Sequence, residues 1–194
     1  MDDTSFVSDG QQRDSVRVSS VDNFGLGTLW VMDAYHVPYG CRYVAGCHDN
    51  SSSRNNISFS VWGAYWSVGV DLGWPNGNII FRSIRSILTS APGGEIDIFE
   101  GVNLQNSNQM TLHTGSGCTM PHGISQTGTA LGTDCGSSPS NNAGCGVVDA
   151  NAKSYGKPFA DSGGGVWVTQ FDTSGIRIWF VPVSDHTSGA ISHG

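Results

Sequence analysis

The chain has 194 residues, a formal net charge of −7 and only 13% charged side chains. This length fits a single folding unit, since all-β domains commonly reach about 250 residues. The acidic balance argues against a nucleic-acid partner, because such binding rests on clustered Lys and Arg that neutralise phosphates. The sequence contains no apolar run of about 18 residues, so no membrane-spanning helix and no membrane partner are expected.

Short runs of β-branched and aromatic residues, separated by Gly, Asn, Ser and Pro, predict an all-β sandwich. The 27 glycines are about twice the usual frequency, which fits a fold with many turns. In chain order, the clear strands are predicted at residues 15–19, 28–36, 109–114, 166–171 and 176–183. An Asp-Thr-Ser-Gly turn sequence at 172–175 joins the last two, which predicts a β-hairpin.

Residues 94–101, with the sequence GEIDIFEG, concentrate carboxylates within strand-forming sequence. Strand side chains alternate between two faces, so Glu95 and Asp97 share one face. An extra residue, a β-bulge at Ile98 and Phe99, would return Glu100 to that same face. The sequence therefore predicts a row of carboxylates over one groove.

Like charges on neighbouring positions of one sheet face repel, so a functional reason is expected for this row. Two carboxylates about 5 to 5.5 Å apart are what a retaining glycosidase uses as nucleophile and acid/base. Asp97, between the two glutamates, can help to hold their pKa values apart. An acidic, solvated edge strand or a calcium site is the alternative, but the apolar residues between the acids indicate a buried opposite face.

Aromatic residues precede the acidic strand. Trp62, Trp66 and Trp74 are candidates to stack on the flat C–H faces of sugar rings, with ordinary core packing as the alternative for each. His113 lies on the next predicted strand, and strands adjacent in sequence are often adjacent in space. It is expected to hydrogen-bond Glu100 or a sugar hydroxyl, and a purely structural role is the alternative.

The cysteines indicate an oxidising destination. Cys118, Cys135 and Cys145 lie in Gly- and Ser-rich stretches, with Cys41 upstream, and they lack the paired spacing of zinc ligands. Disulfides are therefore predicted, with their connectivity open. The first residues are polar and lack a basic segment followed by an apolar core, so no secretory signal is expected within this chain. No metal or other cofactor is expected.

Several motifs together resemble the fungal laminarinases of glycoside hydrolase family 16, which are endo-β-1,3(4)-glucanases. The matching stretches are RDSVRV at 13–18, HVPYGC at 36–41, EIDIFEGVN at 95–103, NQMTLHT at 108–114, GCTM at 117–120, NAGCGV at 142–147 and SYG at 154–156. The resemblance implies a β-jelly-roll, concanavalin A-like sandwich with a glucan cleft along its concave sheet. It also implies Glu95 as nucleophile, Asp97 as its assistant and Glu100 as acid/base.

Two stretches depart from the family pattern. Residues 42–59 and 78–93 interrupt sequence that is continuous in the family. Residues 1–194 are accordingly expected to form one partial catalytic domain, with atypical inserts at these places and incomplete at both ends. We interpret the inserts as translated introns, because their codons are compatible with splice-site sequences. Surface loop insertions, which are well tolerated thermodynamically, are the alternative.

The resemblance implies a retaining endo-glycosidase that hydrolyses β-1,3- or mixed β-1,3/1,4-glucan. Its subsites would be lined by Trp62, Trp66, Trp74 and His113, and its partner would be the β-glucan itself. By the same resemblance, the protein is expected to be monomeric and extracellular. Three alternatives stay open: a cell-wall glucan transglycosylase, a non-catalytic glucan-binding module, and an inactive fragment.

Overall fold

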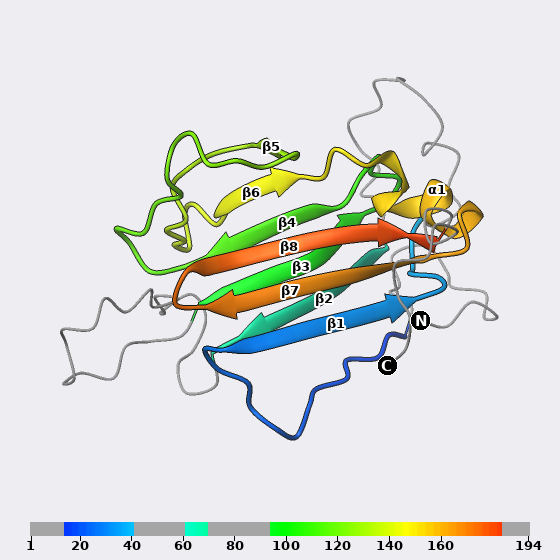
Figure 1. Cartoon of the computed structure of the whole chain (residues 1–194), viewed down its shortest axis with the longest axis horizontal. Coiled ribbons are helices and arrows are strands. Elements are labelled where there is room, and N and C mark those ends of the chain that lie inside the picture. The colour runs from blue at the N-terminus through cyan, green and yellow to red at the C-terminus, as the bar shows by residue number, and fades with distance from the viewer. Residues whose placement is uncertain (1–13, 41–60, 70–93, 184–194) are drawn as a thin grey trace.

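The computed structural model describes residues 14–40, 61–69 and 94–183. Within these ranges the chain forms two antiparallel sheets that lie face to face, with a short helix at one end (Figure 1). One sheet has three strands in the order β1-β7-β8, and the other has five in the order β2-β3-β4-β6-β5. The all-β sandwich expected from the sequence is confirmed.

The three-stranded sheet consists of β1 (Thr28–Ala34), β7 (Gly165–Asp172) and β8 (Gly175–Pro182). The five-stranded sheet consists of β2 (Trp62–Val68), β3 (Glu95–Val102), β4 (Gln109–His113), β5 (Thr129–Ala130) and β6 (Cys145–Val148). A 3₁₀ helix, η1 (Ala152–Ser154), and the helix α1 (Gly156–Asp161) connect β6 to β7. None of the helices in the described ranges has the length and apolar character needed to cross a membrane.

The predicted hairpin is confirmed, since β7 and β8 pair along their whole length with Asp172 opposite Gly175. The Asp172 carboxylate accepts hydrogen bonds from the backbone N–H and the hydroxyl of Ser174, at 2.7 and 2.6 Å. Side-chain acceptors of this kind stabilise tight turns by satisfying backbone donors locally. The strands predicted at 28–36 and 109–114 are also present, as β1 and β4.

The strand predicted at 15–19 is wrong. This stretch is irregular chain, and Val16 and Val18 are 79% and 87% exposed. Its alternation of valine with polar residues has the period of a strand. A strand also needs a neighbour that satisfies its backbone N–H and C=O groups, and no described strand pairs with this stretch.

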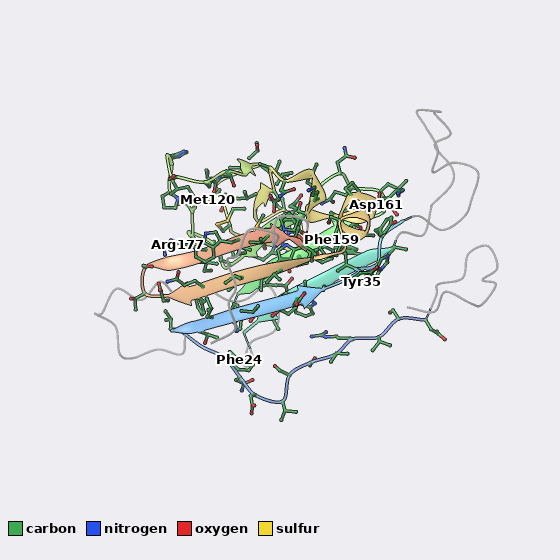
Figure 2. All side chains as sticks on the ribbon, turned by 45° about the vertical axis from the view of Figure 1, so that its right-hand side comes forward. Phe24, Tyr35, Met120, Phe159, Asp161 and Arg177 are labelled. Atoms are coloured by element: carbon green, nitrogen blue, oxygen red, sulfur yellow. A yellow bond between two sulfur atoms is a disulfide. The ribbon has the colours of Figure 1, made fainter. Side chains whose placement is uncertain are left out.

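Aromatic rings fill the space between the sheets. Trp167 of β7 is fully buried, and its ring centroid lies 5.1 Å from that of Phe99 in β3 and 5.0 Å from that of Phe159 in α1. Figure 2 shows Phe159 at the end of the sandwich where α1 lies. Phe99 also stacks on Tyr155, with centroids 5.6 Å apart. Burying a Phe side chain contributes about 1.5 to 3 kcal/mol, so this cluster holds β3 firmly against the other sheet.

The predicted bulge is present in β3. Two successive residues of β2 lie opposite Phe99 and Asp97, which leaves Ile98 as the extra residue. Ile98 and Phe99 are consequently both buried in the core. The residue that follows them, Glu100, is thereby returned to the face of Asp97, as a bulge is expected to do.

The stretches predicted as inserts, 42–59 and 78–93, lie outside the described residues, and so does Trp74. β2, which the chain reaches between these two stretches, pairs along its whole length with β3. The strand that bears the carboxylates therefore has a strand neighbour on both sides, β2 and β4.

Candidate active site

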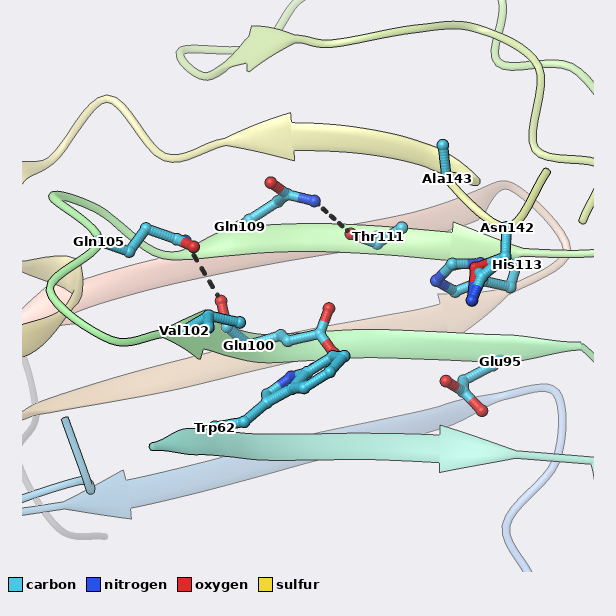
Figure 3. A pocket seen from close by; sticks show the side chains of 10 residues that line it. All are labelled: Trp62, Glu95, Glu100, Val102, Gln105, Gln109, Thr111, His113, Asn142 and Ala143. Atoms are coloured by element: carbon cyan, nitrogen blue, oxygen red, sulfur yellow. Dashed lines mark hydrogen bonds between the residues drawn. The ribbon is translucent and has the colours of Figure 1, made fainter. Parts of the chain in front are cut away.

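A pocket of about 390 Å³ opens over the five-stranded sheet, across β2, β3 and β4 (Figure 3). Its lining residues are Trp62, Glu95, Val102, Glu100, Gln105, Gln109, Thr111, His113, Asn142 and Ala143. Glu95 and Glu100 thus share one pocket, with Asp97 between them on the same strand. Trp62 lies at the Glu100 end of this row and His113 at the Glu95 end.

Two hydrogen bonds of 2.9 Å hold Glu100, and Gln105 Nε2 donates a longer one, of 3.5 Å, to its carbonyl oxygen. Oε1 of Glu100 accepts a hydrogen bond from the indole N–H of Trp62 at 2.9 Å, and its backbone N–H donates to Oδ1 of Asn108 at 2.9 Å. Burial, and after it the negative charge of Asp97, raises the pKa of Glu100, against a lowering by the Trp62 hydrogen bond. Glu100 therefore keeps its proton to a higher pH than an ordinary glutamate.

Glu95 lies opposite His113 in the β3–β4 pairing. Burial and, after it, the negative charge of Asp97 raise the pKa of Glu95 to about 7. The positive charge of protonated His113 acts in the other direction. Both glutamates therefore keep a proton to higher pH than ordinary carboxyl groups do.

Asp97 is only 2% exposed, and its Oδ2 lies 3.4 Å from Nε2 of His113. The contact is an ion pair and not a hydrogen bond, because Oδ2 has no hydrogen-bond partner among the described residues. The interaction with Asp97 is the largest cause that raises the pKa of His113. The other ring nitrogen, Nδ1, lies 2.9 Å from Oγ of Ser137, so the imidazole is oriented from both sides.

The sequence analysis expected His113 to hydrogen-bond Glu100 or a sugar hydroxyl. The structure places His113 against Asp97 and opposite Glu95, and not beside Glu100. The antiparallel register decides this, because β4 runs back from the Glu100 end of β3 and reaches His113 at the Glu95 end. His113 still lines the pocket, so its contact with a sugar hydroxyl stays a prediction. Gly144 makes room for the ring. A Cβ atom there would lie 2.9 Å from Nδ1 of His113 and 2.5 Å from the Leu112 carbonyl oxygen.

The predicted aromatic subsite is only partly assembled in the described residues. Trp62 lines the pocket, but Trp66, which lies opposite Asp97 in the β2–β3 pairing, is not among the lining residues. The guanidinium carbon of Arg17 instead sits 4.5 Å from the centroid of the Trp66 ring, a cation–π arrangement.

Sequence reasoning missed several uncharged polar residues that line the pocket: Gln105, Gln109, Thr111 and Asn142. Their amide and hydroxyl groups are suited to pair with sugar hydroxyls, which both donate and accept hydrogen bonds. Gln109 and Thr111 are joined by a hydrogen bond of 3.1 Å. Alternation along β4 was the available signal, since Gln109 and Thr111 share the face of His113.

Glu95, Asp97 and His113 each offer one ligand atom, and these atoms all lie within 4.8 Å of one another. The set therefore has the spacing of a cation site as well as that of a proton-sharing cluster. Acid/base chemistry on two carboxylates needs no metal, so the absence of a metal stays a prediction.

One disulfide supports the pocket from β6. Cys135 and Cys145 are joined, with Cα atoms 4.3 Å apart, close in sequence to the lining residues Asn142 and Ala143. The prediction that loop cysteines pair is confirmed for these two. Cys118 forms no disulfide with another described cysteine, and Cys41 lies outside the described residues.

The chain matches the family model of an XgeA-like, catalytic GH16 domain over residues 1–45 and 83–193. It is 41% identical, over 92% of its length, to a Schizosaccharomyces pombe protein named as a probable glycosidase. It is 33% identical, over 91% of its length, to an endo-1,3(4)-β-glucanase of Emericella nidulans. The matches cover 35% and 22% of those relatives, so the chain spans about a third or less of their length.

Solved structures show the same relationship. Laminarinase 16A of Phanerochaete chrysosporium, solved with two β-glucans in its donor and acceptor sites, matches with a TM-score of 0.62 and 34% identity. That match covers 84% of this chain and 43% of the laminarinase. An elongating β-1,3-glucosyltransferase matches with a TM-score of 0.58 and 31% identity, over 85% of this chain and 43% of that one.

The likeness to laminarinase 16A confirms the β-jelly-roll sandwich expected from the sequence. The family model covers well over half of the chain, including the whole of the strand that bears the carboxylates. The chain belongs to glycoside hydrolase family 16.

Proposed function

We propose that this chain provides the catalytic cleft of a retaining endo-glycosidase that hydrolyses β-1,3- or mixed β-1,3/1,4-glucan. The observation that supports this most directly is the placement of Glu95 and Glu100 in one pocket, both with raised pKa values and with Asp97 between them. The substrate class follows from the relatives, which include an endo-1,3(4)-β-glucanase and a laminarinase.

In the first step, the Glu95 carboxylate attacks the anomeric carbon of the glucan while Glu100 protonates the departing glycosidic oxygen. A glycosyl ester on Glu95 forms and one glucan fragment leaves. In the second step, the Glu100 carboxylate takes a proton from a water molecule, and that water attacks the anomeric carbon and releases Glu95. Two inversions give products that retain the β configuration.

The attack requires an ionised Glu95 and a protonated Glu100. In the free cleft, the pKa of Glu95 is raised to about 7, so the ionised form needs support. Protonated His113, opposite Glu95, already limits that rise, and the ion pair with Asp97 keeps His113 protonated to higher pH.

The Trp62 indole fits one face of a sugar ring, and the amide groups of Gln105, Gln109 and Asn142 fit its hydroxyls. The disulfide between Cys135 and Cys145 favours an extracellular location, because such bonds persist in oxidising compartments. That the protein is a monomer remains a prediction. Trp66 and Trp74 remain predictions as further contacts for the glucan.

Incubation of the 194-residue chain with laminarin and with mixed-linkage β-glucan tests the proposal. New reducing ends are expected, and proton NMR should show the β anomer before mutarotation. The rate should be the same with EDTA, which tests the prediction that no metal is needed. Initial release of the α anomer, or hydrolysis of neither glucan, would contradict the proposal.

Transglycosylation is a second candidate, favoured by the likeness to an elongating β-1,3-glucosyltransferase. It shares the glycosyl-enzyme and differs only in the acceptor, which is a sugar hydroxyl instead of water. With laminari-oligosaccharide acceptors in excess, a transglycosylase yields products longer than the donor, whereas a hydrolase yields shorter ones.

Asp97→Asn is expected to move the alkaline limb of the pH profile of kcat/KM to lower pH. The negative charge of Asp97 raises the pKa of both glutamates, and this effect outranks the opposing effect of His113 in each case. A neutral amide removes it, so the acid loses its proton at lower pH. Asp161→Asn, at an exposed residue paired with Lys157, is the matched control and should leave the limb in place. If the alkaline limb of Asp97→Asn stays in place or moves to higher pH, the negative charge of Asp97 does not raise the pKa of the acid.

A further inference from the structure

Asn108, immediately before β4, makes two side-chain hydrogen bonds to β3. Its Nδ2 donates to the carbonyl oxygen of Ile98 at 2.8 Å, and its Oδ1 accepts from the backbone N–H of Glu100 at 2.9 Å. The side chain is completely buried. One primary amide therefore binds β3 on both sides of Phe99, at the bulge itself.

The backbone of β4 does not make these bonds. The β3–β4 pairing runs from Glu95 with His113 as far as Asp97 with Thr111 and stops there. The same register continued past the bulge would set Asn108 opposite Glu100. The extra residue, Ile98, removes that match, so two backbone groups of β3 need a partner at this point.

Nor is the backbone of Asn108 available, because it is used on its other side. Its carbonyl oxygen accepts from the N–H of Asp149 at 2.9 Å, and its N–H donates to Oγ of Ser154 at 2.9 Å. These bonds tie Asn108 to the segment that follows β6. A primary amide has the same donor and acceptor as a peptide group, and among side chains only Asn and Gln offer this pair.

We propose that the Asn108 amide replaces a backbone peptide group in the β3–β4 ladder and thereby acts as a positioning residue for Glu100. The inference rests on the proposed function in one respect, the role of Glu100 as acid/base. The Trp62 indole holds the carboxylate end of Glu100, and Asn108 holds the backbone end. Misplacement of a catalytic group by about 1 Å can cost on the order of 100-fold in rate.

The kinetic test compares two substrates that differ in their need for an acid. A laminari-oligosaccharide has a poor leaving group that must be protonated, whereas a 2,4-dinitrophenyl β-laminarioligoside releases a stable phenolate without a proton. Asn108→Ala is expected to lower kcat/KM for the oligosaccharide roughly 10- to 100-fold. For the dinitrophenyl substrate, whose kcat/KM reports only formation of the glycosyl-enzyme, little change is expected. An equal loss on both substrates would overturn the positioning role.

Phe159→Leu is the matched control for general destabilisation. Phe159 is as fully buried as Asn108, but it contacts Trp167 and Phe180 instead of the bulge. Its substitution should lower stability and leave the ratio of the two kcat/KM values unchanged. A leaving-group effect in Phe159→Leu as large as that in Asn108→Ala would also count against the proposal.

Hydrogen exchange measured by NMR tests the two hydrogen bonds from the Asn108 side chain to β3 without any substrate. These two bonds are called the Asn108 clamp. In the unmodified chain, the Glu100 amide and one Nδ2 proton of Asn108 should be protected from exchange. In Asn108→Ala, the Glu100 amide should exchange faster, while the Asp149 amide, which binds the backbone carbonyl of residue 108, should not. If the Glu100 amide and the Asn108 Nδ2 proton exchange freely in the unmodified chain, or if both amides exchange equally faster in the variant, the Asn108 clamp is absent. If these groups are protected in a chain that cleaves no glucan, the Asn108 clamp is supported and the proposed function is rejected.

Discussion

Glu95→Gln is expected to slow glucan hydrolysis by on the order of 10⁴-fold or more, the scale on which covalent hydrolases lose activity with their nucleophile. Glutamine has the shape of glutamate but cannot form the glycosyl ester. The loss should therefore be equally severe on the oligosaccharide and on the 2,4-dinitrophenyl substrate. Glu100→Gln should instead lose most on the oligosaccharide, since only that leaving group needs a proton. The reversed pattern would exchange the two roles.

The same Glu95→Gln protein should be folded, and at neutral to alkaline pH it should be more stable than the unmodified chain. The pKa of Glu95 is raised from 4.5 to about 7 by folding, so the folded state opposes its ionisation. That cost is absent at pH below about 4, where the carboxyl is protonated in both states, and is fully present above pH 7. Denaturant unfolding at acid and alkaline pH measures the difference. A stability deficit at alkaline pH would contradict this account of the site.

Gly101→Ala is expected to destabilise the protein by about 3 kcal/mol, at the upper end of the range for an overpacked core. A Cβ atom at this position would lie 2.1 Å from Cε2 of Tyr155, far inside contact distance. The Tyr155 ring cannot move aside easily, because it is fully buried and stacked on Phe99. Urea unfolding gives the free energy, and activity should also fall because Gly101 directly follows Glu100.

Gly132→Ala is the matched control, since a Cβ atom there meets nothing within 4 Å. Its free energy of unfolding should stay within about 0.5 kcal/mol of the unmodified value. A double-mutant cycle with Tyr155→Leu identifies the cause, because removal of the ring should reduce the cost of Gly101→Ala. If Gly101→Ala proves as harmless as Gly132→Ala, the close packing of β3 on Tyr155 is not as described.

Much of the site could be predicted from local sequence. The spacing of Glu95, Asp97 and Glu100, with apolar residues between them, was enough to predict both a shared face and a bulge. The reason is that the pleat of a strand and the effect of one extra residue are local properties of the backbone. The β7–β8 hairpin was predictable for the same reason, because its turn residues and both strands are contiguous in the chain.

Contacts between distant segments could not be predicted in this way. Residues 15–19 have the alternation of a strand but pair with no described strand. The prediction failed because a sequence pattern specifies the faces of a strand but not its neighbour. The Arg17 guanidinium lies over the Trp66 ring, although 48 residues lie between the two in the sequence. His113 meets Asp97 instead of Glu100, because the register of β4 on β3 decides which side chains face each other.

By itself, the sequence determined the all-β class, the proposed catalytic carboxylates and their common face, because these depend on residue type and on spacing within one strand. Only the tertiary structure decided what surrounds them: the ion pair of His113 with Asp97, the indole of Trp62 on Glu100, and the amide of Asn108 in the ladder. Each of these contacts joins different segments of the chain, and its geometry follows from strand order and register. Those are set by the packing of the whole sandwich around its buried aromatic core.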